Sequence, residues 1–122
     1  MEIKISKKPV KYEEAIEYLD ERVHQVSQNK NEELVWFLEH KPVYTCGVNF
    51  NQKDVLDKSV KIVKTNRGGK ITWHGPGQLI CYFVLDISKR ISNKIYIVFL
   101  NFFFYYFDIF FIKFKVYFFI DF

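Results

Sequence analysis

The chain changes composition sharply near residue 90, and this change limits what a single fold can contain. Residues 1–90 mix charged, apolar and turn-forming residues in the proportions of a globular domain. Residues 91–122 consist almost entirely of Phe, Tyr, Ile, Val, Lys, Asn and Asp, and 15 of these 32 residues are Phe or Tyr. We therefore predict one folded unit over residues 1–90 and a tail of a different kind over residues 91–122.

Three interpretations of the tail compete. Residues 95–112 are 18 mostly apolar residues, which is the length of a membrane-spanning helix. Asp108 interrupts them, and such a residue costs about 2.5 to 3.5 kcal/mol at the centre of a membrane helix. A core segment is the second interpretation, but the stretch has neither helical nor strand periodicity and holds more aromatic volume than a small domain packs. The composition favours the third, a non-native tail read out of frame, because Phe, Tyr, Ile, Lys and Asn have AT-rich codons.

Charge and cysteine content narrow the classes of partner and compartment. The formal net charge of +4 is too small to indicate a nucleic-acid-binding protein. Residues 1–11 carry charges and lack the apolar stretch of a signal peptide, so we expect a cytoplasmic protein with free thiols at Cys46 and Cys81. The spacing of these cysteines relative to His40 and His74 matches no zinc pattern, and no metal site is predicted.

Three segments have clear secondary-structure patterns. Apolar residues recur at helical spacing from Tyr12 to Val26 with acidic residues between them, which predicts an amphipathic helix that stops at the polar residues 29–31. The unbroken apolar run at residues 34–38 is typical of a buried strand. Residues 79–87 predict a long strand that enters the core.

The segments between these elements predict a second set of strands. Because Pro42 cannot donate a ladder hydrogen bond, we expect residues 43–45 to form an edge strand or a loop. A surface connection with one helical turn follows at residues 49–58. Residues 60–65 and 70–73 predict a hairpin around a turn at 66–69. One helix beside a mostly antiparallel sheet is an α+β fold.

The most informative stretch is residues 67–78, which read RGGKITWHGPGQ. Two glycine-rich turns at the ends of one short strand can face the same side of a sheet and line one pocket, and glycines let the backbone approach a ligand closely. Arg67 can clamp a carbonyl, carboxylate or phosphate, His74 can donate or accept a hydrogen bond, and Ile71 and Trp73 offer apolar walls. Such a site suits a ligand with one polar and one apolar end. Taken alone, glycine turns and a single histidine are more often structural.

The full string, followed by a strand that contains Tyr82, resembles the hallmark of the lipoyl(octanoyl) transferase family. Residues 39–47, which read EHKPVYTCG, resemble the upstream motif of that family. The resemblance covers residues 12–90, roughly the first two-fifths of a family member, and implies a truncated catalytic domain of the biotin/lipoate protein ligase type. It also implies an acyltransferase that moves an octanoyl group from acyl carrier protein to a lysine of the lipoyl domains of 2-oxoacid dehydrogenase complexes. No nucleotide or other cofactor is implied, because the donor is already a thioester.

The resemblance also implies which residues bind substrate. In the family, the stretch from the Arg-Gly-Gly to the histidine forms part of the acyl-substrate site, which here corresponds to Arg67, Gly68, Gly69, Lys70, Ile71, Thr72, Trp73 and His74. The cysteine nucleophile of the family and the lysine that activates it lie in the later half of the domain, and no segment of this sequence matches them. Cys46 and Cys81 occupy positions that the family does not use for catalysis, in apolar surroundings that raise a thiol pKa. We therefore assign no catalytic residue.

Two alternatives to an active octanoyltransferase stay open. The first is an inactive, truncated remnant of that enzyme, since the nucleophile and its lysine are missing. The second is an ATP-dependent lipoate or biotin ligase-like protein, although lipoate ligases tend to have a different motif where residues 74–78 read HGPGQ. Basic residues at every third position predict a solvated rim, which would suit an acidic partner such as acyl carrier protein, while a membrane partner is not expected. These basic residues are Lys58, Lys61, Lys64, Arg67 and Lys70.

Overall fold

The computed structural model describes residues 1–65, 69–86 and 112–119, and within these ranges it forms one α-helix, one 3-10 turn and two β-sheets. Predictions that concern Arg67, Gly68, the boundary near residue 90 and the apolar residues 95–111 lie outside the described residues. The elements are β1 (Glu2–Ile5), α1 (Tyr12–Ser27), β2 (Leu34–Leu38), β3 (Val43–Cys46), η1 (Gln52–Asp54), β4 (Ile62–Lys64), β5 (Ile71–His74), β6 (Leu79–Asp86) and β7 (Ile112–Phe119).

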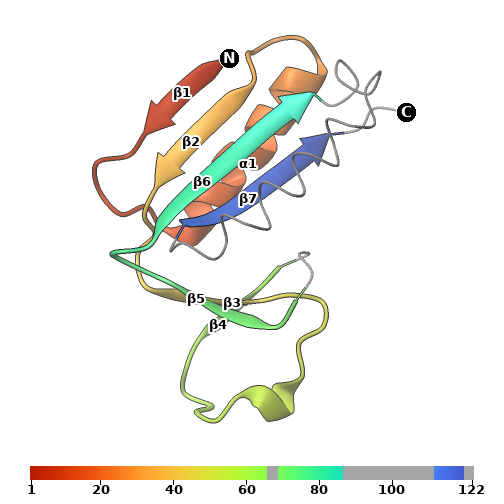
Figure 1. The fold of residues 1–122 in the computed structure, drawn as a ribbon. Helices are drawn as coiled ribbons and strands as arrows, with labels where there is room; N and C mark the ends of the chain where they lie inside the picture. Colours follow the sequence, from red (N-terminus) through yellow and green to blue (C-terminus); the bar gives the residue numbers. More distant parts are fainter. Residues whose placement is uncertain (66–68, 87–111, 120–122) are drawn as a thin grey trace.

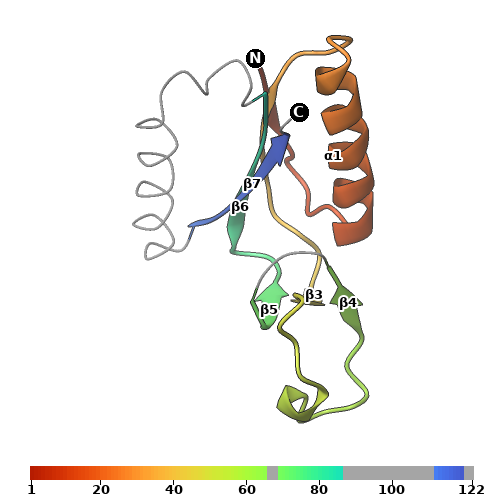
Figure 2. The same cartoon turned by 90° about the vertical axis from the view of Figure 1, so that its right-hand side faces the viewer.

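The two sheets lie one below the other and are joined by two chain crossings. The larger sheet has the order β1-β2-β6-β7, and α1 covers one of its faces (Figures 1 and 2). The smaller sheet has the order β4-β3-β5 and lies beyond the end of the larger sheet where β2 finishes and β6 begins (Figure 1). The chain passes from β2 into β3 through residues 39–42 and returns from β5 to β6 through residues 75–78.

Helix α1 confirms the amphipathic pattern of the sequence. Glu13 and Glu14 lie in its first turn, where carboxylates interact favourably with the positive end of the helix dipole. Its polar stop includes Asn29, which has a positive φ of 52°, a conformation common just after the end of a helix. The apolar face packs on the larger sheet through side chains with 2% exposure or less, at Ala15, Leu19 and Val26.

The core lies between α1 and the two central strands of the larger sheet. Both strands confirm the sequence prediction, although the structure describes β6 only as far as Asp86. They are antiparallel, and the cross-strand pairs whose side chains meet α1 are Leu34 with Val84, Trp36 with Tyr82 and Leu38 with Ile80. All six side chains are at most 3% exposed. Burial of this kind is worth roughly 1.5 to 3 kcal/mol for each large apolar side chain, so these pairs supply much of the stabilisation.

Strand β1 has no counterpart in the sequence predictions, because its apolar side chains point away from the core. Ile3 and Ile5 are 65% and 70% exposed. The polar side chains that alternate with them face α1: Glu2 forms an ion pair with Arg22 at 2.6 Å, and Lys4 Nζ lies 3.5 Å from the centre of the Tyr18 ring. Since α1 crosses over between β1 and β2, the two strands run parallel.

The smaller sheet corrects two predictions. Strand β3 is its central strand rather than an edge or a loop, because Pro42 precedes the first ladder residue and its missing N–H falls outside the hydrogen-bonded region. The predicted hairpin of residues 60–65 with 70–73 was wrong, since β4 and β5 both pair with β3, which lies between them. The strand pairings described are three parallel and two antiparallel, so the sheets of this α+β fold are mixed rather than mostly antiparallel.

Two further predictions concern the surface connection and the tail. The helical turn expected at residues 49–58 is present as η1, where the Lys53 backbone N–H donates to Asn51 Oδ1 at 3.0 Å. Residues 112–119 of the predicted tail form β7, which runs parallel to β6. The non-native origin proposed for residues 91–122 stays a prediction. Within the described ranges, α1 and η1 are too short or too polar to cross a membrane.

Candidate functional site

The two sequence motifs meet at the crossings between the sheets. Glu39 follows β2, and its carboxylate Oε2 accepts a hydrogen bond from the backbone N–H of Gly77 at 3.1 Å. Gly77 belongs to a tight turn that is closed by the Gln78 N–H, which donates to the Gly75 carbonyl at 3.1 Å. Glu39, directly after β2, therefore holds the glycine-rich turn that precedes β6.

The two glycines of this turn are required for different reasons. Gly77 has a φ of 87°, which disfavours a residue with a side chain, although no atom lies within 4 Å of the place where its Cβ would be. A Cβ on Gly75 would lie 2.6 Å from Cη2 of Trp73 and closer still to Cζ2, so the indole ring occupies the space of a side chain there. The Trp73 ring therefore packs directly against the backbone of the turn at Gly75.

His74 ends β5 and is held by the far side of the same turn. Its Nδ1 lies 2.7 Å from Oε1 of Gln78. Its imidazole is stacked parallel to the Tyr12 ring, with centroids 6.3 Å apart and an interplanar angle of 7°. Because Tyr12 is the first residue of α1 and is 4% exposed, the start of the helix and the end of β5 meet at this pair of rings.

His40 is fully buried, and both of its ring nitrogens have hydrogen-bond partners. Nδ1 lies 3.1 Å from the carbonyl oxygen of Val10, which can only accept, so Nδ1–H donates to it. Nε2 then accepts a hydrogen bond from the Tyr82 hydroxyl at 2.6 Å. The His40 ring lies 5.2 Å from the Tyr12 ring and 5.9 Å from that of His74. We call these four side chains, Tyr12, His40, His74 and Tyr82, the aromatic cluster.

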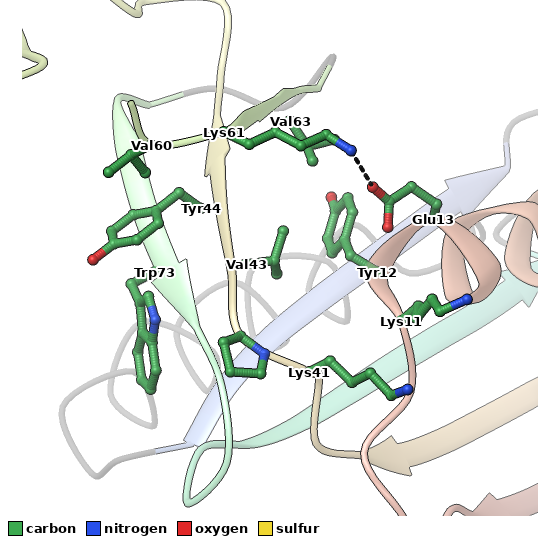
Figure 3. Close-up of a pocket in the computed structure, with 11 residues that line it drawn as sticks. Lys11, Tyr12, Glu13, Lys41, Val43, Tyr44, Val60, Lys61, Val63 and Trp73 are labelled. Carbon is green, nitrogen blue, oxygen red and sulfur yellow. Dashed lines mark ion pairs between the residues drawn. The ribbon is translucent and has the colours of Figure 1, made fainter. Parts of the chain in front are cut away.

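A groove of about 420 Å³ opens between the start of α1 and the smaller sheet (Figure 3). Valine, proline and aromatic side chains form most of its wall, and Figure 3 shows Val43 and Val63 close to Tyr12. The volume lies within the range of small-molecule sites in proteins. The lining residues are Lys11, Tyr12, Glu13, Lys41, Pro42, Val43, Tyr44, Val60, Lys61, Val63 and Trp73.

The rim of the groove carries more positive than negative charge. Lys11, Lys41 and Lys61 lie along it, and all three are exposed. Lys61 Nζ is 4.0 Å from Glu13, and Lys11 forms an exposed ion pair at 3.0 Å with a second glutamate of the first helical turn. Solvent screens exposed ion pairs of this kind, and their attraction is weak. Both lysines can therefore still attract a negatively charged ligand. An apolar wall with a cationic rim suits a ligand with an apolar chain and a negatively charged carrier.

The structure places the predicted substrate-binding residues at different distances from the groove. Gly69 and Lys70 are exposed residues before β5, and the Lys70 carbonyl accepts from the Gly47 N–H at 3.2 Å. Among the described residues of the predicted set, Trp73 lines the groove, and it is 43% exposed. His74 does not line the groove itself, but its ring stacks on that of Tyr12, which does. Ile71 and Thr72 are half-buried within β5.

Several residues of the groove and of the aromatic cluster were not predicted as site residues. Tyr12 was assigned only to the apolar face of the helix, Tyr82 only to a motif that carries the resemblance, and His40 to such a motif and to a metal site that was not predicted. Val60 was assigned to a strand. The signal that was available for His40 and Glu39 is their place directly after a buried strand, where polar side chains from two crossings can meet.

Neither described cysteine is placed as a nucleophile. Both are free thiols, as predicted, and both are buried, with Cys46 2% and Cys81 0% exposed. Burial raises the pKa of the Cys81 thiol to about 12, so this group keeps its proton at neutral pH. The cysteines therefore have structural positions, one in each sheet.

Comparison with known proteins gives the family. The model of the lipoyl protein ligase A/B catalytic domain matches residues 11–107 of this chain. The chain belongs to that family. The match extends past residue 90, while the boundary drawn there from composition stays a prediction. The sequence resemblance and the expected α+β domain of the lipoate ligase type are confirmed.

Individual relatives are named octanoyltransferases. The chain is 43% identical over 86 residues to the octanoyltransferase of Wolbachia sp. subsp. Brugia malayi (strain TRS), and these residues make up 70% of this chain and 42% of the relative. It is 44% identical over 91 residues to that of Anaplasma phagocytophilum (strain HZ), which covers 74% and 44%. The identity to the octanoyltransferase of Bradyrhizobium diazoefficiens is 42% over 90 residues, covering 74% and 36%. The chain therefore spans about two-fifths of the length of these relatives.

Proposed function

We propose that this protein takes part in octanoyl transfer, from acyl carrier protein to a lysine of the lipoyl domains of 2-oxoacid dehydrogenase complexes. The observation that carries the proposal is the apolar groove walled by Trp73, a residue of the motif that resembles the acyl site of the family. The relatives that share this part of the chain are named octanoyltransferases.

The groove has the chemistry that an octanoyl chain requires. Its wall is formed by aliphatic and aromatic side chains from the start of α1, from the start of β3, from β4 and the segment before it, and from β5. Burying a methylene group is worth about 0.8 kcal/mol, so six of them supply roughly 5 kcal/mol of gross binding free energy. A groove open on one side leaves the thioester end of the chain accessible to a second substrate.

The lysine rim supports the choice of an acidic carrier. Acyl carrier proteins are acidic, and opposite charges around a binding site raise the rate of association. Of the three lysines, Lys41 is the best candidate for contact with the acidic carrier, because no described carboxylate forms an ion pair with it. A thioester donor needs no nucleotide, and free cysteines suit the reducing cytoplasm as the place of the reaction.

A second candidate is acyl binding without transfer. Family members, by the resemblance stated above, accept the acyl group on a cysteine. Cys81 is buried with a pKa of about 12, and Cys46 is 2% exposed, so neither described thiol is placed to attack a thioester in the groove. This observation favours a chain that holds an octanoyl group but does not pass it on by itself.

The experiment mixes the full chain with octanoyl acyl carrier protein and an apo lipoyl domain and follows the intact mass of each protein. Transfer predicts a lipoyl domain heavier by one octanoyl group. Binding of the octanoyl carrier without any gain in mass supports the second candidate. Failure of the folded chain to bind the carrier at all contradicts both.

Two matched variants locate the binding site. Val60→Asp puts a charge on the groove wall and is expected to weaken binding of the octanoyl carrier at least tenfold, because the carboxylate must be desolvated beside the acyl chain. Leu56→Asp makes a comparable change at a side chain that is 99% exposed and outside the groove, and it should leave binding unchanged. Equal effects of the two variants would rule out the groove as the acyl site.

A further inference from the structure

The side chain of Gln78 folds back across the glycine turn onto the histidine four residues before it. Gln78 Oε1 lies 2.7 Å from His74 Nδ1, a short hydrogen bond. An amide oxygen can only accept, so the proton of this bond belongs to Nδ1. A neutral imidazole carries one proton, which leaves Nε2 of His74 as an acceptor.

The backbone holds Gln78 in this place. Its own N–H donates to the Gly75 carbonyl at 3.1 Å, which closes the turn. Gly77 provides the positive φ of 87° that the turn needs, and its N–H is fixed by the Glu39 carboxylate at 3.1 Å. Two hydrogen bonds and the backbone conformation of Gly77 therefore define where the Gln78 amide can reach, and His74 lies within that reach.

The neighbouring histidine has the same arrangement from different partners. His40 donates from Nδ1 to the Val10 carbonyl and accepts at Nε2 from the Tyr82 hydroxyl. The rings of His40 and His74 are 5.9 Å apart. In both imidazoles of the aromatic cluster, Nδ1 therefore faces a carbonyl oxygen, that of the Val10 backbone for His40 and that of the Gln78 side chain for His74.

We propose that Gln78 is a positioning residue that holds His74 in the tautomer with the proton on Nδ1. Nε2 is then the atom through which His74 accepts a hydrogen bond, or a proton, from an N–H or O–H group of a ligand. If the proposed function holds, that group is the amine of the acceptor lysine. The tautomer itself does not depend on the transfer activity.

The test is nitrogen NMR of the imidazole side chains in the full chain, which contains three histidines. His74 is expected to show a protonated Nδ1 and an unprotonated Nε2, and His40 the same. His24 is exposed and should show the average of exchanging tautomers. In Gln78→Ala, the ratio of the two His74 tautomers should fall about tenfold, the effect of removing one hydrogen bond.

Three controls separate positioning from folding. Gln25→Ala removes another glutamine, whose amide donates to Glu21 at 3.0 Å, and should leave His74 unchanged. Gln78→Glu keeps an acceptor at the same reach, so it should keep the tautomer and move the titration of His74 to higher pH, because a carboxylate stabilises the imidazolium. The His40 resonances report whether the fold is native, since that side chain is fully buried.

A proton on Nε2 of His74 in the unmodified chain would overturn the proposal, as would an unchanged ratio in Gln78→Ala with native His40 resonances. If Gln78→Ala does not fold, the outcome rests on Gln78→Glu: a tautomer that is lost, or a titration that does not move to higher pH, would overturn the proposal. Absence of octanoyl transfer with the expected tautomer counts against the proposed function alone.

Discussion

Replacing Gly75 with alanine would place a methyl group in space that the Trp73 indole occupies. The new Cβ would lie 2.6 Å from Cη2 of that ring, where carbon atoms normally approach no closer than about 3.5 Å. Gly75 has no positive φ, so the strain is steric rather than conformational. Since Trp73 is 43% exposed, the ring can swing outward, and we expect a loss of about 1 to 2 kcal/mol in the free energy of unfolding.

A double-mutant cycle isolates this contact. In a chain that already carries Trp73→Ala, the Gly75→Ala change should cost close to nothing, which gives a coupling energy of about 1 to 2 kcal/mol. Urea denaturation followed by circular dichroism measures the four free energies. Gly77→Ala serves as the control, because its cost of about 1 kcal/mol arises from a φ of 87° and should not depend on Trp73. A Gly75→Ala cost that is equal with and without the indole would refute the reasoning.

Three other predictions concern the buried cluster, the thiol and the rim. Tyr82→Phe removes the only hydroxyl that donates to His40 Nε2 among the hydrogen bonds described, so urea denaturation should show a loss of about 1 to 3 kcal/mol; an unchanged stability would contradict that bond. Cys81, with a pKa of about 12 against an ordinary 9.0, stays protonated, so mass spectrometry should find iodoacetamide labelling only after unfolding and no rise in the native rate between about pH 7 and pH 9. Lys41→Glu should slow association with octanoyl acyl carrier protein, most strongly at low ionic strength in stopped-flow measurements, whereas Lys30→Glu, beyond the other end of α1, should not; equal effects would exclude the rim.

The elements that the sequence predicted well are those whose pattern is local. Helix α1 and strand β2 follow from the spacing of apolar residues within single segments, and the apolar side chains that they bury are ones that the spacing placed there, although Arg22 of α1 is buried as well. Strand β1 was missed because its alternation is inverted, with Ile3 and Ile5 outward and Glu2 paired with Arg22 of the helix. Apolar residues mark the core only when a second layer covers them.

The elements that the sequence predicted poorly depend on pairing between distant segments. Two strands joined by a glycine turn normally form a hairpin, yet β3 takes the place between β4 and β5. Thr45 of β3 is fully buried, and the backbone of β3 pairs with β4 on one side and with β5 on the other. No spacing within residues 60–73 contains that information, because the strand that decides the pairing comes before them.

The candidate site was predicted in part for the same reason. Trp73 and His74 were identified from one continuous motif, and both lie where the two sheets meet. The groove as a whole combines residues 11–13, 41–44, 60, 61, 63 and 73, which approach each other only when the chain has folded. The motif shows which strand contributes to the site, and the topology determines what lies opposite.

The claim that the groove receives the octanoyl chain is tested most directly at the two tryptophan side chains. The chain is labelled with nitrogen-15 and titrated with S-octanoyl-N-acetylcysteamine, a small octanoyl thioester, while the two indole N–H signals are followed by NMR. We predict a saturable shift of the Trp73 signal and a constant signal for Trp36, which is 3% exposed and donates to Ser6 Oγ at 3.0 Å. A Trp73 signal that does not move, or an equal shift of both signals, would contradict the account.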